Sequence, residues 1–249
     1  MLAVLADRPP PAAGPPSLLT VGDVAYPQAK KDDRPAAGAA GAGVLGLGGT
    51  FPPLPFSGEE SRRVRRLFEP SQVTALEGAA ATEKAVTAAV AGRRYLHLAA
   101  HGFLDERYGN LFGALALAPP PPGREAPGDD GFLELHEVYR LPLGECELAV
   151  LSACETNAGP QRPLEAGVTL AGGFLAAGAR RVVASHWSVE DRSTAELMAA
   201  FFEQVTAARG DGRVSFARAL QRARQRVRSR PEWSAPFYWA PFVLLGPGD

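Results

Sequence analysis

Leu148-Ala149-Val150-Leu151-Ser152-Ala153-Cys154-Glu155-Thr156 is the stretch that decides the fold of this 249-residue chain. A short apolar run bounded by charged and polar residues is typical of a buried strand. In α/β folds such a strand presents its last residues at the carboxyl edge of the sheet, where these folds build their sites. Cys154 ends this strand, so we expect its thiol at that edge.

A second stretch, Tyr95-Leu96-His97-Leu98-Ala99-Ala100-His101-Gly102, has the same design and ends in a histidine and a glycine. If the two strands are parallel neighbours, an imidazole and a thiol lie side by side at one edge of the sheet. The interval between His101 and Cys154 leaves room for a crossover made of a hairpin and a short helix. A thiol beside an imidazole is the pair that Cys-His nucleophilic catalysts use.

Strands and helices alternate along the rest of the chain. Apolar runs predict further strands at 17–23, 73–76, 112–117, 132–135, 181–186 and 242–245. Amphipathic or capped segments predict helices at 59–68, 83–91, 137–141, 164–177, 192–208 and 214–229. Segment 27–55 is rich in Gly, Ala and Pro and predicts a loop with little structure of its own. We therefore expect a mainly parallel sheet covered by helices on both faces, formed by residues 17–249, with 1–16 as a tail or truncated N-terminal end.

Composition excludes several classes of function. The net charge is −1, from 26 basic and 27 acidic residues, so nothing indicates binding to nucleic acid or to an anionic membrane surface. No apolar run approaches the length of a membrane span. Cys146 and Cys154 would lie ~27 Å apart along an extended strand, too far for a disulfide between them. Reduced thiols indicate a cytoplasmic protein.

Two other patterns resemble ligand sites but do not predict them. His97 and His101 share a strand, so their spacing lacks the helical geometry of a His-x-x-x-His zinc site, and we expect no metal. Gly41-Ala42-Gly43-Val44-Leu45-Gly46 matches a dinucleotide-binding pattern. No strand leads into it, so a flexible loop is the better interpretation, and we expect no cofactor.

Six motifs stand in order along the chain: HLAAHG (97–102), DGFL (130–133), VLSACET (150–156), FLAAGARRVVAS (174–185), WSVED (187–191) and FYWAPFVLLG (237–246). Together they resemble the successive signatures of the CHAT domain, a caspase- and separase-like group of cysteine proteases that is often fused to tetratricopeptide repeats. The resemblance runs from about Leu18 to Gly246. It implies a caspase-like three-layer α/β/α sandwich, with His101 as the catalytic histidine and Cys154 as the nucleophile.

The implied chemistry is that of a cysteine endopeptidase acting on a protein substrate. A nearby imidazole favours the thiolate that attacks an amide carbonyl, and it then returns a proton to the leaving amine. In the related folds the backbone N–H groups of the nucleophile and of the glycine after the histidine, here Cys154 and Gly102, bind the oxyanion. No third catalytic residue can be named from the sequence.

Asp191 matches an acidic position of separase-like members that lies near the pocket for the residue before the cleaved bond. A buried carboxylate there favours Arg or Lys through a charge-assisted hydrogen bond. The alternative is that Asp191 only caps the N-terminus of the helix that follows it.

Departures from the family pattern leave other functions open. Ala100 stands where Thr is usual, Asn157 where Gly is common, and His186 where Leu is usual and where an imidazole could disturb or supplement the site. No tetratricopeptide repeats precede the domain in this sequence, which leaves three alternatives: a fragment of a larger protein, a truncated copy, or a stand-alone domain regulated by a separate sensor or repeat-containing partner. One rival function is a catalytically silent interaction or signalling module, and another is an amidase acting on small molecules.

Overall fold

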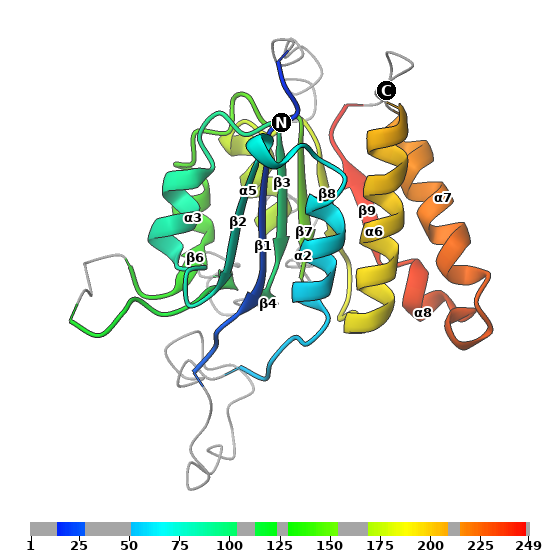
Figure 1. Cartoon of the computed structure of the whole chain (residues 1–249), viewed down its shortest axis with the longest axis horizontal. Helices are drawn as coiled ribbons and strands as arrows, with labels where there is room; N and C mark the ends of the chain where they lie inside the picture. The colour runs from blue at the N-terminus through cyan, green and yellow to red at the C-terminus, as the bar shows by residue number, and fades with distance from the viewer. Residues whose placement is uncertain are drawn as a thin grey trace, which may run out of the picture.

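A six-stranded sheet forms the centre of the computed structural model, which describes residues 14–27, 51–103, 113–123, 129–153, 169–208 and 215–247 (Figure 1). Its strand order is β2-β1-β3-β7-β8-β9. In that order the strands span Val73–Gly78, Leu18–Val24, Tyr95–Ala99, Leu148–Ser152, Val182–Ser185 and Phe242–Leu245. The first five are parallel, and β9 runs antiparallel to β8. The expected mainly parallel sheet is confirmed.

Side chains alternate along the strands, so each face of the sheet buries its own apolar core. One face packs against α3 (Glu83–Ala89), α4 (Leu135–Val138) and α5 (Leu170–Ala177). The other packs against α2 (Ser57–Arg65), α6 (Asp191–Ala207) and α7 (Phe216–Arg228). In β3, for example, Leu96 and Leu98 belong to the first core and Tyr95 to the second. The result is the three-layer α/β/α sandwich that the sequence predicts, with α2 and α6 on one face of the sheet (Figure 1).

The predicted strand at 95–102 is in fact two strands in different sheets. β3 ends at Ala99, and after Ala100 the chain starts β4 (His101–Phe103). β4 pairs antiparallel with β5 (Ala114–Ala116), and β5 pairs with β6 (Phe132–Glu134) in a separate three-stranded sheet. An unbroken apolar run does not show where one strand ends and the next begins, because the pairing of His101 with β5 forms only in the folded chain.

Short local signals place the helix ends. The hydroxyls of Thr82, Thr169 and Ser215 accept a backbone N–H in the first turn of α3, α5 and α7. Gly92 and Gly178, which follow α3 and α5, have positive φ values of 69° and 127°. The sequence does not predict three short elements: the turns at Pro70–Gln72 and Pro231–Trp233, and the helix α8 (Pro236–Trp239). Residues 164–168 of the predicted fourth helix lie outside the described residues, as do 28–50 of the predicted loop.

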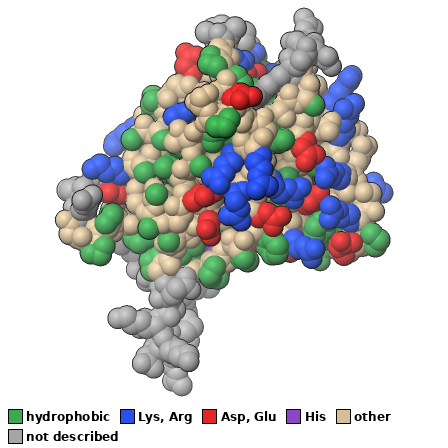
Figure 2. Space-filling model, viewed as in Figure 1, with side chains coloured by type: hydrophobic (Ala, Val, Ile, Leu, Met, Phe, Trp, Pro, Cys, Tyr) green, Lys and Arg blue, Asp and Glu red, His purple; other side chains and the backbone are tan. Residues whose placement is uncertain are grey.

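Ion pairs tie the outer helices α2, α6 and α7 together on the face shown in Figure 2, where basic side chains gather among acidic ones. Glu196 of α6 lies 3.0 Å from Arg63 of α2, 3.1 Å from Arg226 of α7 and 2.8 Å from Arg230. Arg63, Arg226 and Arg230 therefore share Glu196 as an acidic partner. None of the helices within the described ranges is both long and apolar enough to cross a membrane.

Candidate active site

The two strands that lead to the predicted catalytic residues, β3 and β7, are parallel neighbours. β3 pairs with β7 in a register that sets Leu98 opposite Leu151 and Ala99 opposite Ser152. His101 follows Ala99 by two residues, and Cys154 follows Ser152 by two. Cys154 itself lies outside the described residues, as do Glu155 to Asn157. The described part of the site is therefore the His101 side and the strand that leads into the cysteine.

A cavity of about 30 Å³, open to solvent, lies at this carboxyl edge of the sheet. Its lining includes His101, Ala153 and Asp191. α2 and α6 begin at the same edge as β4 (Figure 1), and they contribute Glu60 and Thr194 to the wall. The cavity thus gathers the histidine, the residue before the cysteine, and the predicted acidic residue from three separate parts of the chain.

His101 is held by contacts on its ring and on its backbone. Its Nε2–H donates to the carbonyl oxygen of Pro52 at 2.8 Å. The ring stacks on Phe51 at 5.3 Å between centroids and lies 5.1 Å from the ring of Tyr26. The Tyr26 hydroxyl accepts the His101 backbone N–H at 3.0 Å and donates to the carbonyl of Ala116 at 3.3 Å. Within the described ranges Nδ1 has no hydrogen-bond partner, so it is the ring nitrogen that carries the lone pair.

The Pro52 carbonyl is the orienting group that sequence reasoning did not find. It lies in the segment predicted to be a loop with little structure, and a backbone carbonyl has no sequence signature. Phe51, an aromatic residue directly after a Gly/Ala-rich stretch, is the one available signal that this segment packs onto the core. Burial lowers the pKa of His101 below 6.5, and the bond to Pro52 only partly opposes the shift. The imidazole is therefore neutral at pH 7 and able to accept a proton.

Asp191 lines the cavity as the first residue of α6, and it is not the capping residue of that helix. The N-cap is Glu190, whose carboxylate accepts the backbone N–H groups of Arg192 and Ser193. Oδ2 of Asp191 instead accepts the backbone N–H of Phe56 at 2.8 Å. Burial raises the pKa of Asp191, the bond from Phe56 opposes the rise, and the nearby carboxylates add to it.

A buried pair, His97 with Glu60, lies under the cavity and was missed by sequence reasoning. Both side chains are almost fully buried, and His97 Nε2 lies 2.6 Å from Glu60 Oε1. His97 Nδ1 lies 2.9 Å from the Thr20 hydroxyl, and the ring packs edge-on against Phe202. Both ring nitrogens are therefore occupied by side chains. The sequence signal was a histidine inside an otherwise apolar strand, which needs buried partners.

The directions of the hydrogen bonds determine the net charge of this pair. Ser61 Oγ donates to Glu77 and so accepts from Thr20 Oγ1, which thereby uses its one proton. His97 Nδ1 must then carry a proton and donate it to Thr20. A second proton lies in the short contact between Nε2 and Glu60. The histidine and the carboxyl group together are therefore neutral.

The other residues singled out from the sequence take simpler positions. Gly102 lies in β4, where it pairs with Leu115. Cys146 is fully buried, and burial raises the pKa of its thiol to about 12, which suits a packing role. His186 is exposed and does not line the cavity, and its backbone N–H donates to Pro241.

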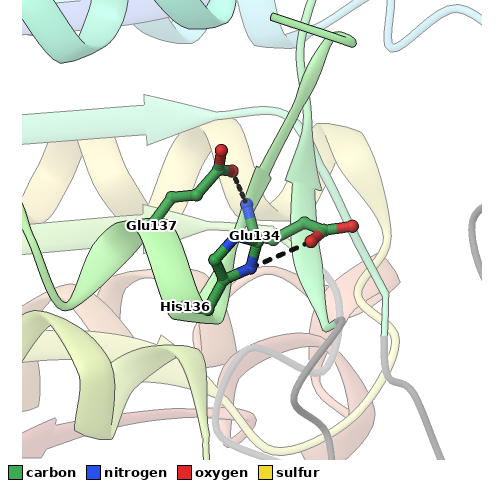
Figure 3. Close-up of side chains that lie close together, drawn as sticks. All are labelled: Glu134, His136 and Glu137. Atoms are coloured by element: carbon green, nitrogen blue, oxygen red, sulfur yellow. Dashed lines mark hydrogen bonds and ion pairs between the residues drawn. The ribbon is translucent and has the colours of Figure 1, made fainter. Parts of the chain in front are cut away.

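One group of residues within the described ranges has the composition of a metal site, and it lies at the junction of β6 and α4. Figure 3 shows Glu134, His136 and Glu137 at this junction. His136 Nδ1 lies 3.0 Å from Glu134 Oε2, and the backbone N–H of Glu134 donates to Glu137 Oε2 at 2.9 Å. The bond to Glu137 is one half of the capping box that begins α4, and the contact of His136 with Glu134 is a separate pair, so each group has a protein partner.

Comparison with solved structures supports the fold. The chain superposes on the crystal structure of the Arg specific cysteine proteinase gingipain R with a TM-score of 0.54 and 10% identity, covering 93% of this chain and 46% of that one. It also superposes on the complex of Porphyromonas gingivalis RgpB pro- and mature domains with a TM-score of 0.56 and 11% identity, covering 93% and 47%. The chain thus spans about half the length of these proteins, and the likeness is one of fold.

No curated protein is similar enough in sequence to count as a match. A family model does match: the CHAT domain aligns with residues 3–247, which is essentially the whole chain. With the parallel β3–β7 pair, the three layers and the cavity at the carboxyl edge, this match means that the chain belongs to the CHAT domain family, whose domain is caspase-like.

Proposed function

We propose that this protein is a cysteine endopeptidase that hydrolyses peptide bonds of a protein substrate after a basic residue, with His101 and Cys154 as the catalytic pair. The observation that carries the proposal is the cavity at the ends of β3 and β7, which joins His101, the residue before Cys154, and Asp191. The protein acts in the cytoplasm without a cofactor. Its partners are the substrate and a regulatory sensor or repeat-containing protein.

Catalysis begins with proton transfer to His101. Nδ1 takes the proton of the Cys154 thiol, and the thiolate sulfur bonds to the carbonyl carbon of the substrate. The tetrahedral oxyanion accepts hydrogen bonds from the backbone N–H groups of Cys154 and Gly102. When the C–N bond breaks, the imidazolium returns the proton to the leaving amine. Water, deprotonated by the same imidazole, then hydrolyses the thioester and releases the free thiol.

The bond between His101 Nε2 and Pro52 supports this cycle in two ways. It holds the ring in one orientation, so the lone pair on Nδ1 is the one available to a proton. It also stabilises the imidazolium that forms after proton transfer, because a carbonyl oxygen is a better acceptor for a charged donor. The Asp191 carboxylate attracts a basic side chain that precedes the cleaved bond.

Labelling by an activity-based electrophile that carries an Arg or Lys recognition group tests the proposal. We expect covalent labelling that Cys154→Ala abolishes and Cys146→Ala leaves intact, because we assign the nucleophile to Cys154, whereas the thiol of Cys146 is fully buried. Peptide-library cleavage should favour a basic residue before the cleaved bond, and Asp191→Asn should weaken that preference. A preference for apolar or acidic residues would contradict the role of Asp191. Absence of labelling in the presence of its partner would favour the silent interaction module.

A further inference from the structure

Two hydroxyl groups in the cavity lack hydrogen-bond partners. Thr194 of α6 is 4% exposed and Ser152 of β7 is 6% exposed, and both line the cavity. Neither Thr194 Oγ1 nor Ser152 Oγ has a hydrogen-bond partner among the described residues. A buried hydroxyl without a partner destabilises a protein, because its desolvation is not compensated. Two of them in one cavity indicate that a polar ligand completes the site.

The two carboxyl groups of the cavity are each anchored by one oxygen only. Glu60 Oε1 is held by His97, and Asp191 Oδ2 is held by the Phe56 backbone N–H. The other oxygens, Glu60 Oε2 and Asp191 Oδ1, have no hydrogen-bond partner within the described part of the chain. The anchoring bonds fix both groups in place and leave one acceptor of each for a ligand.

The charge and the number of acceptors identify the ligand class. Because the Glu60–His97 pair is neutral, the cavity carries the single negative charge of Asp191, which matches one monovalent cation. The acceptors left for a ligand are the second oxygens of Glu60 and Asp191 and the two hydroxyls, on three different elements. A lysine ammonium has three donors and cannot satisfy them all, whereas a guanidinium has five in a fixed plane.

We propose that Glu60, held by His97, is a second specificity-determining residue, and that with Asp191, Thr194 and Ser152 it makes the cavity a guanidinium site that selects arginine over lysine. The role of this site in substrate recognition rests on the proposed function. The binding of a guanidinium, however, does not require catalysis. A test on inactive protein therefore separates the two.

The test uses the full chain carrying Cys154→Ala and measures binding of argininamide and lysinamide by isothermal titration calorimetry. We expect argininamide to bind about tenfold more tightly than lysinamide, since lysinamide leaves a buried acceptor without a donor. Glu60→Gln should weaken argininamide binding about tenfold and bring the two ligands within about threefold of each other. The Gln Oε1 can still accept from His97. Glu59→Gln, on the same helix but exposed, is the matched control and should change neither affinity.

Thr194→Val is a second variant of nearly unchanged shape, and it should also weaken argininamide binding, by about fivefold. Equal affinities for the two ligands, or a ratio unchanged by both variants, would overturn the inference. So would the absence of argininamide binding at millimolar concentration. If argininamide binds but Cys154 is not labelled, the proposed protease activity is contradicted and the guanidinium site is not. If Cys154 is labelled equally by Arg and Lys probes, the guanidinium site is contradicted and the protease activity is not.

Discussion

His101 is suited to act as a base because its neighbours disfavour the imidazolium in the free site and hold the ring in one orientation. Phe51 and Tyr26 shield the ring from water, and the Pro52 carbonyl accepts the hydrogen bond from Nε2–H. Shielding disfavours the imidazolium of the free site. The same residue on an exposed strand end would titrate as an ordinary histidine and turn freely, so its surroundings, more than its identity, make it a candidate base.

An NMR titration of the His101 ring in the Cys154→Ala protein should therefore give a midpoint below 6.5. Because the folded state takes up this proton less readily than the unfolded state, the free energy of unfolding should fall as the pH drops below 6.5. Phe51→Ala admits water to the ring and should move the midpoint up towards that value. Loss of the signal in His101→Gln establishes the assignment. A midpoint above 6.5 in the parent protein would contradict the shielding argument.

At the scale of elements, the turn that ends α5 determines the position at which β8 begins. Gly178 has φ 127°, a conformation that side chains rarely adopt. A Cβ at this position would lie 2.8 Å from the backbone of Leu143 and of Gly144. The next residues continue into Val182, so the turn sets where β8 begins beside β7.

Gly178→Ala should therefore lower the free energy of unfolding by about 2 kcal/mol, through backbone strain and the close contact. Urea unfolding measures the change. Gly144→Ala is the matched control, since a Cβ there meets nothing within 4 Å and its φ is not positive. If the two variants were equally stable, the turn would not be the constraint that we infer.

For the whole molecule, the central sheet couples the two apolar cores. Neighbouring residues of one strand, such as Leu18 and Leu19, belong to opposite cores. A strand therefore cannot leave one core without leaving the other. We expect the domain to unfold in a single transition, so a substitution that destabilises one core lowers the stability of the other core by the same amount.

Phe174→Ala tests this coupling, because Phe174 is fully buried in the core opposite to that of Trp233. The substitution should cost ~3–5 kcal/mol. Tryptophan fluorescence and circular dichroism should report the same shifted midpoint. Separate midpoints by the two probes would mean that the faces unfold independently.

The elements that the sequence predicts well are those with local causes. Thr82 and Gly178 bound their helices through contacts within a few residues, and the apolar runs of β3 and β7 have the length and composition of buried strands. The family motifs add the CHAT assignment. The break between β3 and β4 has no such local cause, since it depends on pairing with β5.

The sequence by itself determined two buried apolar strands, one followed within two residues by a histidine and the other by a cysteine, because strand formation and order along the chain are local properties. Only the tertiary structure decided what surrounds them. Pro52 reaches His101 across 49 residues, Glu60 reaches His97 across 37, and Phe56 reaches Asp191 across 135. Hydrogen bonds between such distant groups form only when packing of the two cores brings them within reach, so no local sequence pattern predicts them.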